Sequence, residues 1–205
     1  MFSVLEGSHG ATARAHGARR LLRCAAAIGL LAVLGALGAW AQDEGPGEYP
    51  HKATFLAQFP NFIEWPESAF AEPKSSFLIC VFGNFSFGTS LAQATANGSF
   101  HGRKLEVRWM KKITDVRACQ ILFVSRSEAG RYGPVLGAAR NGGILTVGET
   151  RDFLGAGGAI CFSYDADILR FEVNLAATKE ARLTISARLL ALAKHVWERP
   201  EGARG

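Results

Sequence analysis

The sequence predicts an α/β fold, a three-layer sandwich with a mostly parallel central sheet and an antiparallel edge hairpin. Continuous apolar runs of strand length at residues 77–82 and 119–124 are typical of strands covered on both faces. Segments with helical periodicity alternate with these runs, which favours a layered α/β arrangement. Residues 159–164 and 168–173 are strand-like segments on either side of a short acidic turn, and this pattern predicts the hairpin.

The first predicted element is a helix that begins at His51. Its apolar side chains fall on one helical face, and Pro60 should kink or end it. The elements expected next are a helix over 86–97, a strand over 104–110 with one wetter face, the buried strand 119–124, a helix over 127–140 and a strand over 143–147.

The last predicted element is a helix over residues 175–197, with Asn174 as its N-cap. A broad apolar stripe along this segment must be buried against the sheet or against a second subunit. The stripe consists of Ile185, Leu189, Leu192 and Val196.

Composition excludes several classes of protein. The chain has 205 residues, of which 48% are hydrophobic and 20% charged, so it is neither a disordered tail nor a coiled coil. Its net charge of +5 invites a nucleic-acid interpretation. Four arginines and one glutamate lie within residues 1–41, which leaves 19 of the 23 basic and 17 of the 18 acidic residues for the rest. No basic face is therefore indicated, and we expect no nucleic-acid partner.

The N-terminus has the features of a secretory signal peptide. A basic segment at 14–23 precedes an apolar run at 25–39, and Ala39-Trp40-Ala41 offers a cleavage site. The alternative is a permanent anchor, but a spanning helix needs roughly 20 apolar residues and this run is shorter. The expected organisation is a cleaved leader at 1–41, a flexible lead-in at 42–50, a folded domain at 51–197 and a polar tail at 198–205.

The sequence contains no recognisable catalytic motif. His51, His101 and His195 show no metal-ligand spacing, and two aspartates in the hairpin turn are ordinary turn residues. The loop 83–88 follows a strand, as phosphate loops do, but it lacks their signatures and is better explained as a tight turn. We therefore predict no enzyme, no catalytic residue, no cofactor and no metal ion.

The cysteines of the mature chain carry more information. Cys80 and Cys119 lie on buried-type strands, so in an oxidising compartment they can pair across a long loop. Such a bridge stabilises the fold by about 4 kcal/mol in the chain-entropy account. The alternative is two buried free thiols. Cys161 is the third cysteine and is left over if these two pair.

Several segments, in their order and spacing, resemble the YfiR family over roughly residues 51–197. They are 51–56 (HKATFL), 62–66 (FIEWP), 77–81 (FLICV), 119–123 (CQILF), 144–148 (ILTVG), 171–175 (FEVNL) and 186–193 (SARLLALA). The resemblance implies a small bacterial periplasmic α/β protein that tends to dimerise. It also implies a regulator that binds and represses a membrane-anchored diguanylate cyclase of the YfiN type, with effects on cyclic-di-GMP signalling and biofilm formation. The alternative function is a periplasmic small-ligand-binding or accessory module of another envelope system.

The resemblance also bears on the cysteines. Cys80 and Cys119 match one disulfide of the family, and Cys161 matches one half of a second. The partner of that second bridge would lie a few residues upstream, where residues 153–156 contain no cysteine. Cys161 is therefore expected to be a free thiol, and a redox response through the second bridge is in doubt.

Five residues are candidates for partner binding. Ile160 and Phe162 share one face of the hairpin by the two-residue period, and Glu172 should point away from the face of its neighbours. Trp65 and Trp109 are of the type enriched at interfaces. For the apolar and aromatic residues the alternative is core packing, and for Glu172 it is an ordinary solvated carboxylate.

Overall fold

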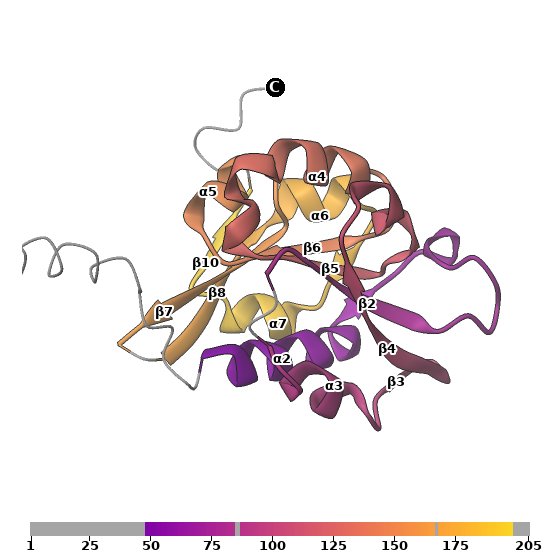
Figure 1. Ribbon diagram of the computed structural model, residues 1–205. Coiled ribbons are helices and arrows are strands. Elements are labelled where there is room, and N and C mark those ends of the chain that lie inside the picture. The colour runs from indigo at the N-terminus through magenta and orange to yellow at the C-terminus, as the bar shows by residue number, and fades with distance from the viewer. Residues whose placement is uncertain (1–47, 85–86, 167, 199–205) are drawn as a thin grey trace, which may run out of the picture. The chain divides into compact units, whose positions relative to one another are not determined.

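A mixed sheet lies at the centre of the fold (Figure 1). The computed structural model describes residues 48–84, 87–166 and 168–198, so the predicted leader, most of the lead-in and most of the tail lie outside it. Within these residues the sheet has eight strands in the order β10-β8-β7-β6-β5-β2-β4-β3. The strands are β2 (Phe77–Phe82), β3 (Ser99–Phe100), β4 (Arg103–Met110), β5 (Ile121–Val124), β6 (Leu145–Gly148), β7 (Ile160–Asp165), β8 (Ile168–Asn174) and β10 (His195–Trp197).

The strand directions confirm the predicted fold class. Neighbouring strands from β4 through β2, β5 and β6 to β7 are parallel, as are β8 and β10. The pairs β7–β8 and β3–β4 are antiparallel. The hairpin lies near one end of the sheet with β10 added outside it, so it is less exposed than expected.

Helices cover both faces of the sheet (Figure 1). On one face lie α2 (Glu48–Gln58), α3 (Ser90–Thr95) and α7 (Ala187–Leu192), and on the other α4 (Tyr132–Ala139), α5 (Arg151–Gly155) and α6 (Leu175–Glu180). Shorter 3₁₀ turns are η1 (Phe59–Asn61), η2 (Glu67–Ala69), η3 (Ile113–Ala118) and η4 (Arg126–Arg131). A two-stranded antiparallel ribbon joins β1 (Ile63–Glu64) to β9 (Thr184–Ile185). None of the helices in the described ranges has the length and apolarity needed to cross a membrane.

Strand β2 shows why its sequence is apolar throughout. Phe77, Ile79 and Val81 point into the core on the α2 side, and Cys80 and Phe82 into the core on the α4 side. All five side chains are at most 1% exposed. A strand buried on both faces leaves no position for a polar residue.

Helix α2 begins at Glu48, three residues before the predicted start, so residues 48–50 of the predicted lead-in are helical. Pro60 lies in the first positions of η1, just after α2 ends at Gln58. This is the break that proline imposes by removing a donor from the helix. Phe59 then stacks on Phe162 of β7 at a centroid distance of 6.0 Å.

The prediction of one long helix over residues 175–197 is wrong. Helix α6 ends where Arg182 adopts a left-handed backbone with φ of 57°. Residues 184–185 then pair with β1, Ser186 caps α7, and residues 195–197 form β10. The helical spacing of the predicted apolar stripe does not correspond to one buried helix face, because Leu192 is 60% exposed while Ile185 and Val196 lie on strands.

Candidate functional site

Cys80 and Cys119 form a disulfide that ties β2 to the residues just before β5. The two cysteines are 39 residues apart in sequence, and both are buried. The bridge lies in the core on the α4 side of the sheet. It therefore stabilises the central pair of parallel strands and is not exposed to a partner.

Cys161 is a buried free thiol on β7. Burial, together with the charges of Glu172 and Glu149, raises the pKa of this thiol to about 12. Its Sγ donates a hydrogen bond of 3.1 Å to the carbonyl of Thr150. A buried thiol with a raised pKa is a poor nucleophile, so Cys161 has the character of a core residue.

The structure does not bring the five candidate partner-binding residues together on one surface. Ile160 and Phe162 are at most 2% exposed and belong to the core beneath α2. Glu172 is 8% exposed and accepts a hydrogen bond of 2.8 Å from the indole of Trp197 on β10. Trp65 follows β1 and Trp109 lies on β4, where it is 39% exposed. Binding roles for these residues stay predictions.

A buried ionic cluster joins α2 to the carboxyl ends of β5 and β6. Lys52 bonds the carboxylates of both Glu48 and Glu149, and the side chains of Lys52 and Glu149 are each only 1% exposed. Arg126, just after β5, donates its backbone N–H to Glu149 over 2.8 Å and approaches the same carboxylate with Nε at 3.5 Å. The hydroxyl of Tyr49 donates to Glu149 at 3.3 Å.

The cluster is electrostatically balanced around Glu149. Burial alone would raise the pKa of its carboxyl group, but the charge and hydrogen bond of Lys52 and the donors of Arg126 outweigh burial and lower it. Glu149 is therefore ionised at neutral pH, and the cluster fixes the start of α2 to the sheet. Sequence reasoning missed this cluster, although the i, i+4 spacing of Glu48 and Lys52 is a recognisable helical ion-pair signal.

A groove beside Trp65 is large enough to bind a ligand or a partner's side chain. It has a volume of about 670 Å³ and is lined by the segment after β1 and by the β3–β4 hairpin. Its floor is aromatic: Trp65 packs edge-on against Phe77 and Phe100, and Phe70 stacks on Phe100 at 6.0 Å. The indole N–H of Trp65 donates to the Gln120 carbonyl at 3.2 Å, so the ring is held in place.

The rim of this groove is acidic. The exposed side chains of Glu64, Glu67 and Glu72 line it. The facing cation is Arg103, whose guanidinium lies 4.0 Å from the centre of the Phe70 ring and donates to the carbonyls of Glu72 and Ser75. Arg103 is thus engaged in holding the loop, and the groove favours an apolar group that carries a positive charge.

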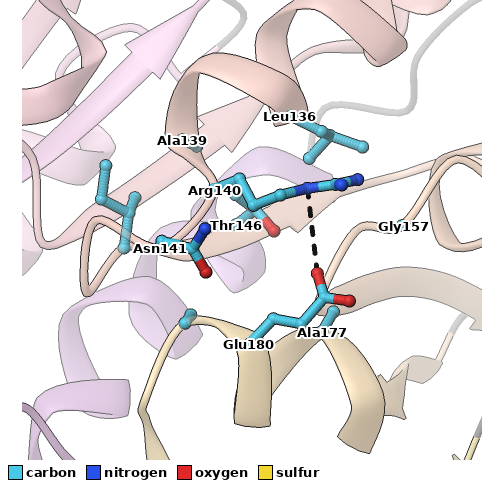
Figure 2. A pocket seen from close by; sticks show the side chains of 10 residues that line it. Leu136, Ala139, Arg140, Asn141, Thr146, Gly157, Ala177 and Glu180 are labelled. Atoms are coloured by element: carbon cyan, nitrogen blue, oxygen red, sulfur yellow. Dashed lines mark ion pairs between the residues drawn. The ribbon is translucent and has the colours of Figure 1, made fainter.

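A second hollow, between α4 and α6, is too small to bind a ligand. Figure 2 shows Arg140 and Glu180 facing each other across it, with a separation of 3.9 Å. Both side chains are more than half exposed, and the volume of about 30 Å³ suits a single water molecule. Within the described part of the chain, no group of three or more histidine, cysteine or acidic side chains is arranged to hold a metal ion.

The chain is similar to two solved structures of low sequence identity. One is a conserved domain protein from Vibrio cholerae O1 biovar El Tor, with 14% identity, a TM-score of 0.48, and coverage of 73% of this chain and 60% of that chain. The other is the ABC domain in complex with L-Trp from Streptococcus pneumonia, with 13% identity, a TM-score of 0.46, and coverage of 72% and 60%. The chain therefore spans about three fifths of the length of each.

Comparison with curated protein sequences gives no match. The sequence model of the YfiR/HmsC-like family (DUF4154) matches residues 49–194. This range extends from the start of α2 to the residue before β10, and it includes the disulfide, the ionic cluster apart from Glu48, and the groove. The chain belongs to the YfiR/HmsC-like family.

Proposed function

We propose that the mature chain is a non-enzymatic periplasmic regulator that binds and represses a membrane-anchored diguanylate cyclase. Through that enzyme it would tune cyclic-di-GMP signalling and biofilm formation. The observation that carries this proposal is the family match over residues 49–194, which spans nearly all of the folded unit. The leader expected at residues 1–41 agrees with a periplasmic location.

The groove beside Trp65 is the surface that we assign to the cyclase. Its aromatic floor offers a rigid apolar pocket, and its rim carries the carboxylates of Glu64, Glu67 and Glu72. Interfaces commonly place an aromatic pocket at the centre and charges at the rim. The occupant that fits is a segment of the cyclase's periplasmic domain with an apolar side chain beside a lysine or arginine.

Charge reversal at the rim tests this assignment. Glu64→Lys and Glu67→Lys change exposed side chains, so both variants should keep the wild-type melting temperature. Each should weaken binding to the isolated periplasmic domain about tenfold in titration calorimetry, and added salt should reduce the difference. Glu180→Lys is the matched control, because Glu180 is 59% exposed and lies on α6, outside the groove.

Affinity that is unchanged in both rim variants would exclude the groove as the docking surface. Failure of the wild-type protein to bind the periplasmic domain would contradict the proposed function itself. A gene for a membrane cyclase next to the gene for this chain is the simplest supporting observation. A genome without any such cyclase would favour the alternative function, a periplasmic ligand-binding or accessory module.

The alternative is a periplasmic small-ligand-binding module, and one observation favours it. A volume of about 670 Å³ lies within the range of small-molecule sites, and the aromatic floor is typical of them. A thermal-shift screen with amphipathic amines distinguishes the two functions. Stabilisation by such an amine without any affinity for the cyclase domain would support the ligand-binding module.

A further inference from the structure

Another opening adjoins the groove beside Trp65, and its charge is opposite. Phe70 and Ala71 line both openings, and the remaining walls of this one come mainly from β2, β4 and η3. Its volume of about 480 Å³ lies within the range of small-molecule sites. We call it the arginine pocket, because Arg108 of β4 and Arg117 of η3 both line it.

The wall of the arginine pocket is held in place by Gln120, which is only 3% exposed. Its side-chain Nε2 donates a hydrogen bond of 2.6 Å to the Ala69 carbonyl, and its Oε1 accepts the backbone N–H of Leu78 at 2.7 Å. These two bonds tie η2 to the start of β2. The pocket is therefore formed before any ligand enters, as small-molecule sites usually are.

The disulfide keeps the two arginine-bearing segments together. Arg108 lies opposite Cys80 in the register of β4 with β2. Arg117 lies two residues before Cys119. The Cα atoms of the two cysteines are 5.9 Å apart, so the covalent bridge fixes the end of η3 beside the central strands. Both guanidinium groups thus belong to backbone segments with a fixed relative position.

The arginine pocket carries a net positive charge. Within the described part of the chain, no carboxylate forms an ion pair with the exposed side chains of Arg108 and Arg117. Glu106 is the acidic residue that lines the pocket, and its Oε1 accepts a hydrogen bond of 2.8 Å from the Ser76 hydroxyl. Two guanidinium charges therefore face one carboxylate, and both guanidinium groups are available to a ligand.

We propose that the arginine pocket binds a small molecule with a dianionic group, either a phosphate or a pair of carboxylates. A guanidinium can donate two parallel N–H bonds to the oxygens of such a group, and two arginines match its two charges. Leu78 and Ala118 also line the pocket and suit a short hydrocarbon part of the ligand. Glu106 repels the dianion and limits the affinity. This inference does not depend on the proposed function, since the pocket lies outside the acidic rim assigned to the cyclase.

Titrations with inorganic phosphate and with succinate test the proposal. The mature, disulfide-bonded protein is titrated at constant ionic strength, with sodium chloride as the reference salt, because screening alone also changes with added salt. Backbone amide NMR signals of Arg108 and Ala118 should shift and saturate with at least one of the two dianions. Saturation by phosphate alone identifies a phosphate-bearing ligand, and saturation by succinate alone identifies a dicarboxylate.

Four variants test the roles of the charged side chains. Arg108→Gln and Arg117→Gln should each weaken binding about tenfold, because each removes one charge-assisted pair of hydrogen bonds. Glu106→Gln should bind severalfold more tightly, because it removes the repelling charge. Arg188→Gln is the matched control, since Arg188 is exposed on α7, on the opposite face of the sheet from α4, and its affinity should equal that of the wild type.

Thermal melts check that every variant is folded, which the exposure of all four side chains favours. The proposal is overturned if neither dianion causes shifts beyond those of sodium chloride, or if the shifted signals lie outside the pocket. It is also overturned if Arg108→Gln and Arg117→Gln bind as tightly as the wild type, or if Glu106→Gln weakens binding as they do.

Discussion

Replacement of Lys52 by methionine removes the ammonium group that lies between the carboxylates of Glu48 and Glu149. The methionine side chain has a similar length and fills the same space beneath α2, so the substitution tests charge more than packing. The physical consequence is an uncompensated carboxylate, because the side chain of Glu149 is only 1% exposed. Burial of an unpaired charge is strongly destabilising.

The contacts that remain set the size of the effect. Breaking a buried ion pair by removing one partner costs about 3–5 kcal/mol. Glu149 would keep the backbone N–H of Arg126 at 2.8 Å, the Tyr49 hydroxyl at 3.3 Å and the Arg126 Nε at 3.5 Å. We therefore expect the lower end of the range, a loss of about 3 kcal/mol in the free energy of unfolding. For a domain of this size that corresponds to roughly 6–12 °C in melting temperature.

Urea unfolding at neutral pH, followed by tryptophan fluorescence with the disulfide intact, measures the loss. Arg126→Met is the matched control: its side chain is 40% exposed, so the loss should be about 1 kcal/mol or less. In the Lys52→Met background, Glu149→Gln removes the orphaned charge and should recover part of the stability. Equal losses in Lys52→Met and Arg126→Met, both near 1 kcal/mol, would refute a buried cluster that fixes α2 to the sheet.

Four further predictions concern pH, the disulfide, the free thiol and processing. The pKa of Glu149 in the folded protein lies below its ordinary value of 4.5, so the ionised carboxylate stabilises the fold above pH 4.5 and this stabilisation is lost on acidification. In urea titrations between about pH 5 and pH 3, the wild type should therefore lose more stability than Glu149→Gln. Replacing Cys80 and Cys119 together by serine should lower the free energy of unfolding by about 4 kcal/mol. In the folded protein, peptide mapping at pH 8 should find Cys161 unmodified by maleimide, with labelling only after denaturation. Mass spectrometry of the periplasmic protein should show Gln42 at its N-terminus, and recovery of the intact leader in membranes would contradict cleavage.

Local signals in the sequence predicted the central layers of the fold. The apolar run of β2, the break at Pro60 and the cap at Asn174 each depend on residues close in sequence, and each is present in the structure. The C-terminal segment differs, because β9 pairs with β1 about 120 residues earlier. Pairing with a distant strand decides the structure of this segment against its helical periodicity, and the neighbouring sequence contains no signal that reveals the pairing.

The candidate site was less predictable for the same reason. Trp65 was singled out by residue type, but the groove exists only because the β3–β4 hairpin brings Phe100 and Arg103 beside it. Similarly, Glu149 follows a strand and has no sequence feature that links it to Lys52, 97 residues away. Hydrophobic patterning gave the core position of Ile160 and Phe162 as an alternative, and burial beneath α2 favours that interpretation.

The function that we propose for this chain is repression of a membrane diguanylate cyclase through the periplasmic domain of that enzyme. The most direct test reconstitutes a full-length membrane diguanylate cyclase from the same organism in vesicles, with its periplasmic domain accessible, and measures cyclic-di-GMP formation from GTP as the mature protein is added. We predict a saturable fall in the rate of synthesis, with Glu67→Lys requiring a concentration about tenfold higher for the same effect and Glu180→Lys matching the wild type. A rate of synthesis that stays constant at saturating concentrations of the folded, disulfide-bonded protein would contradict the account.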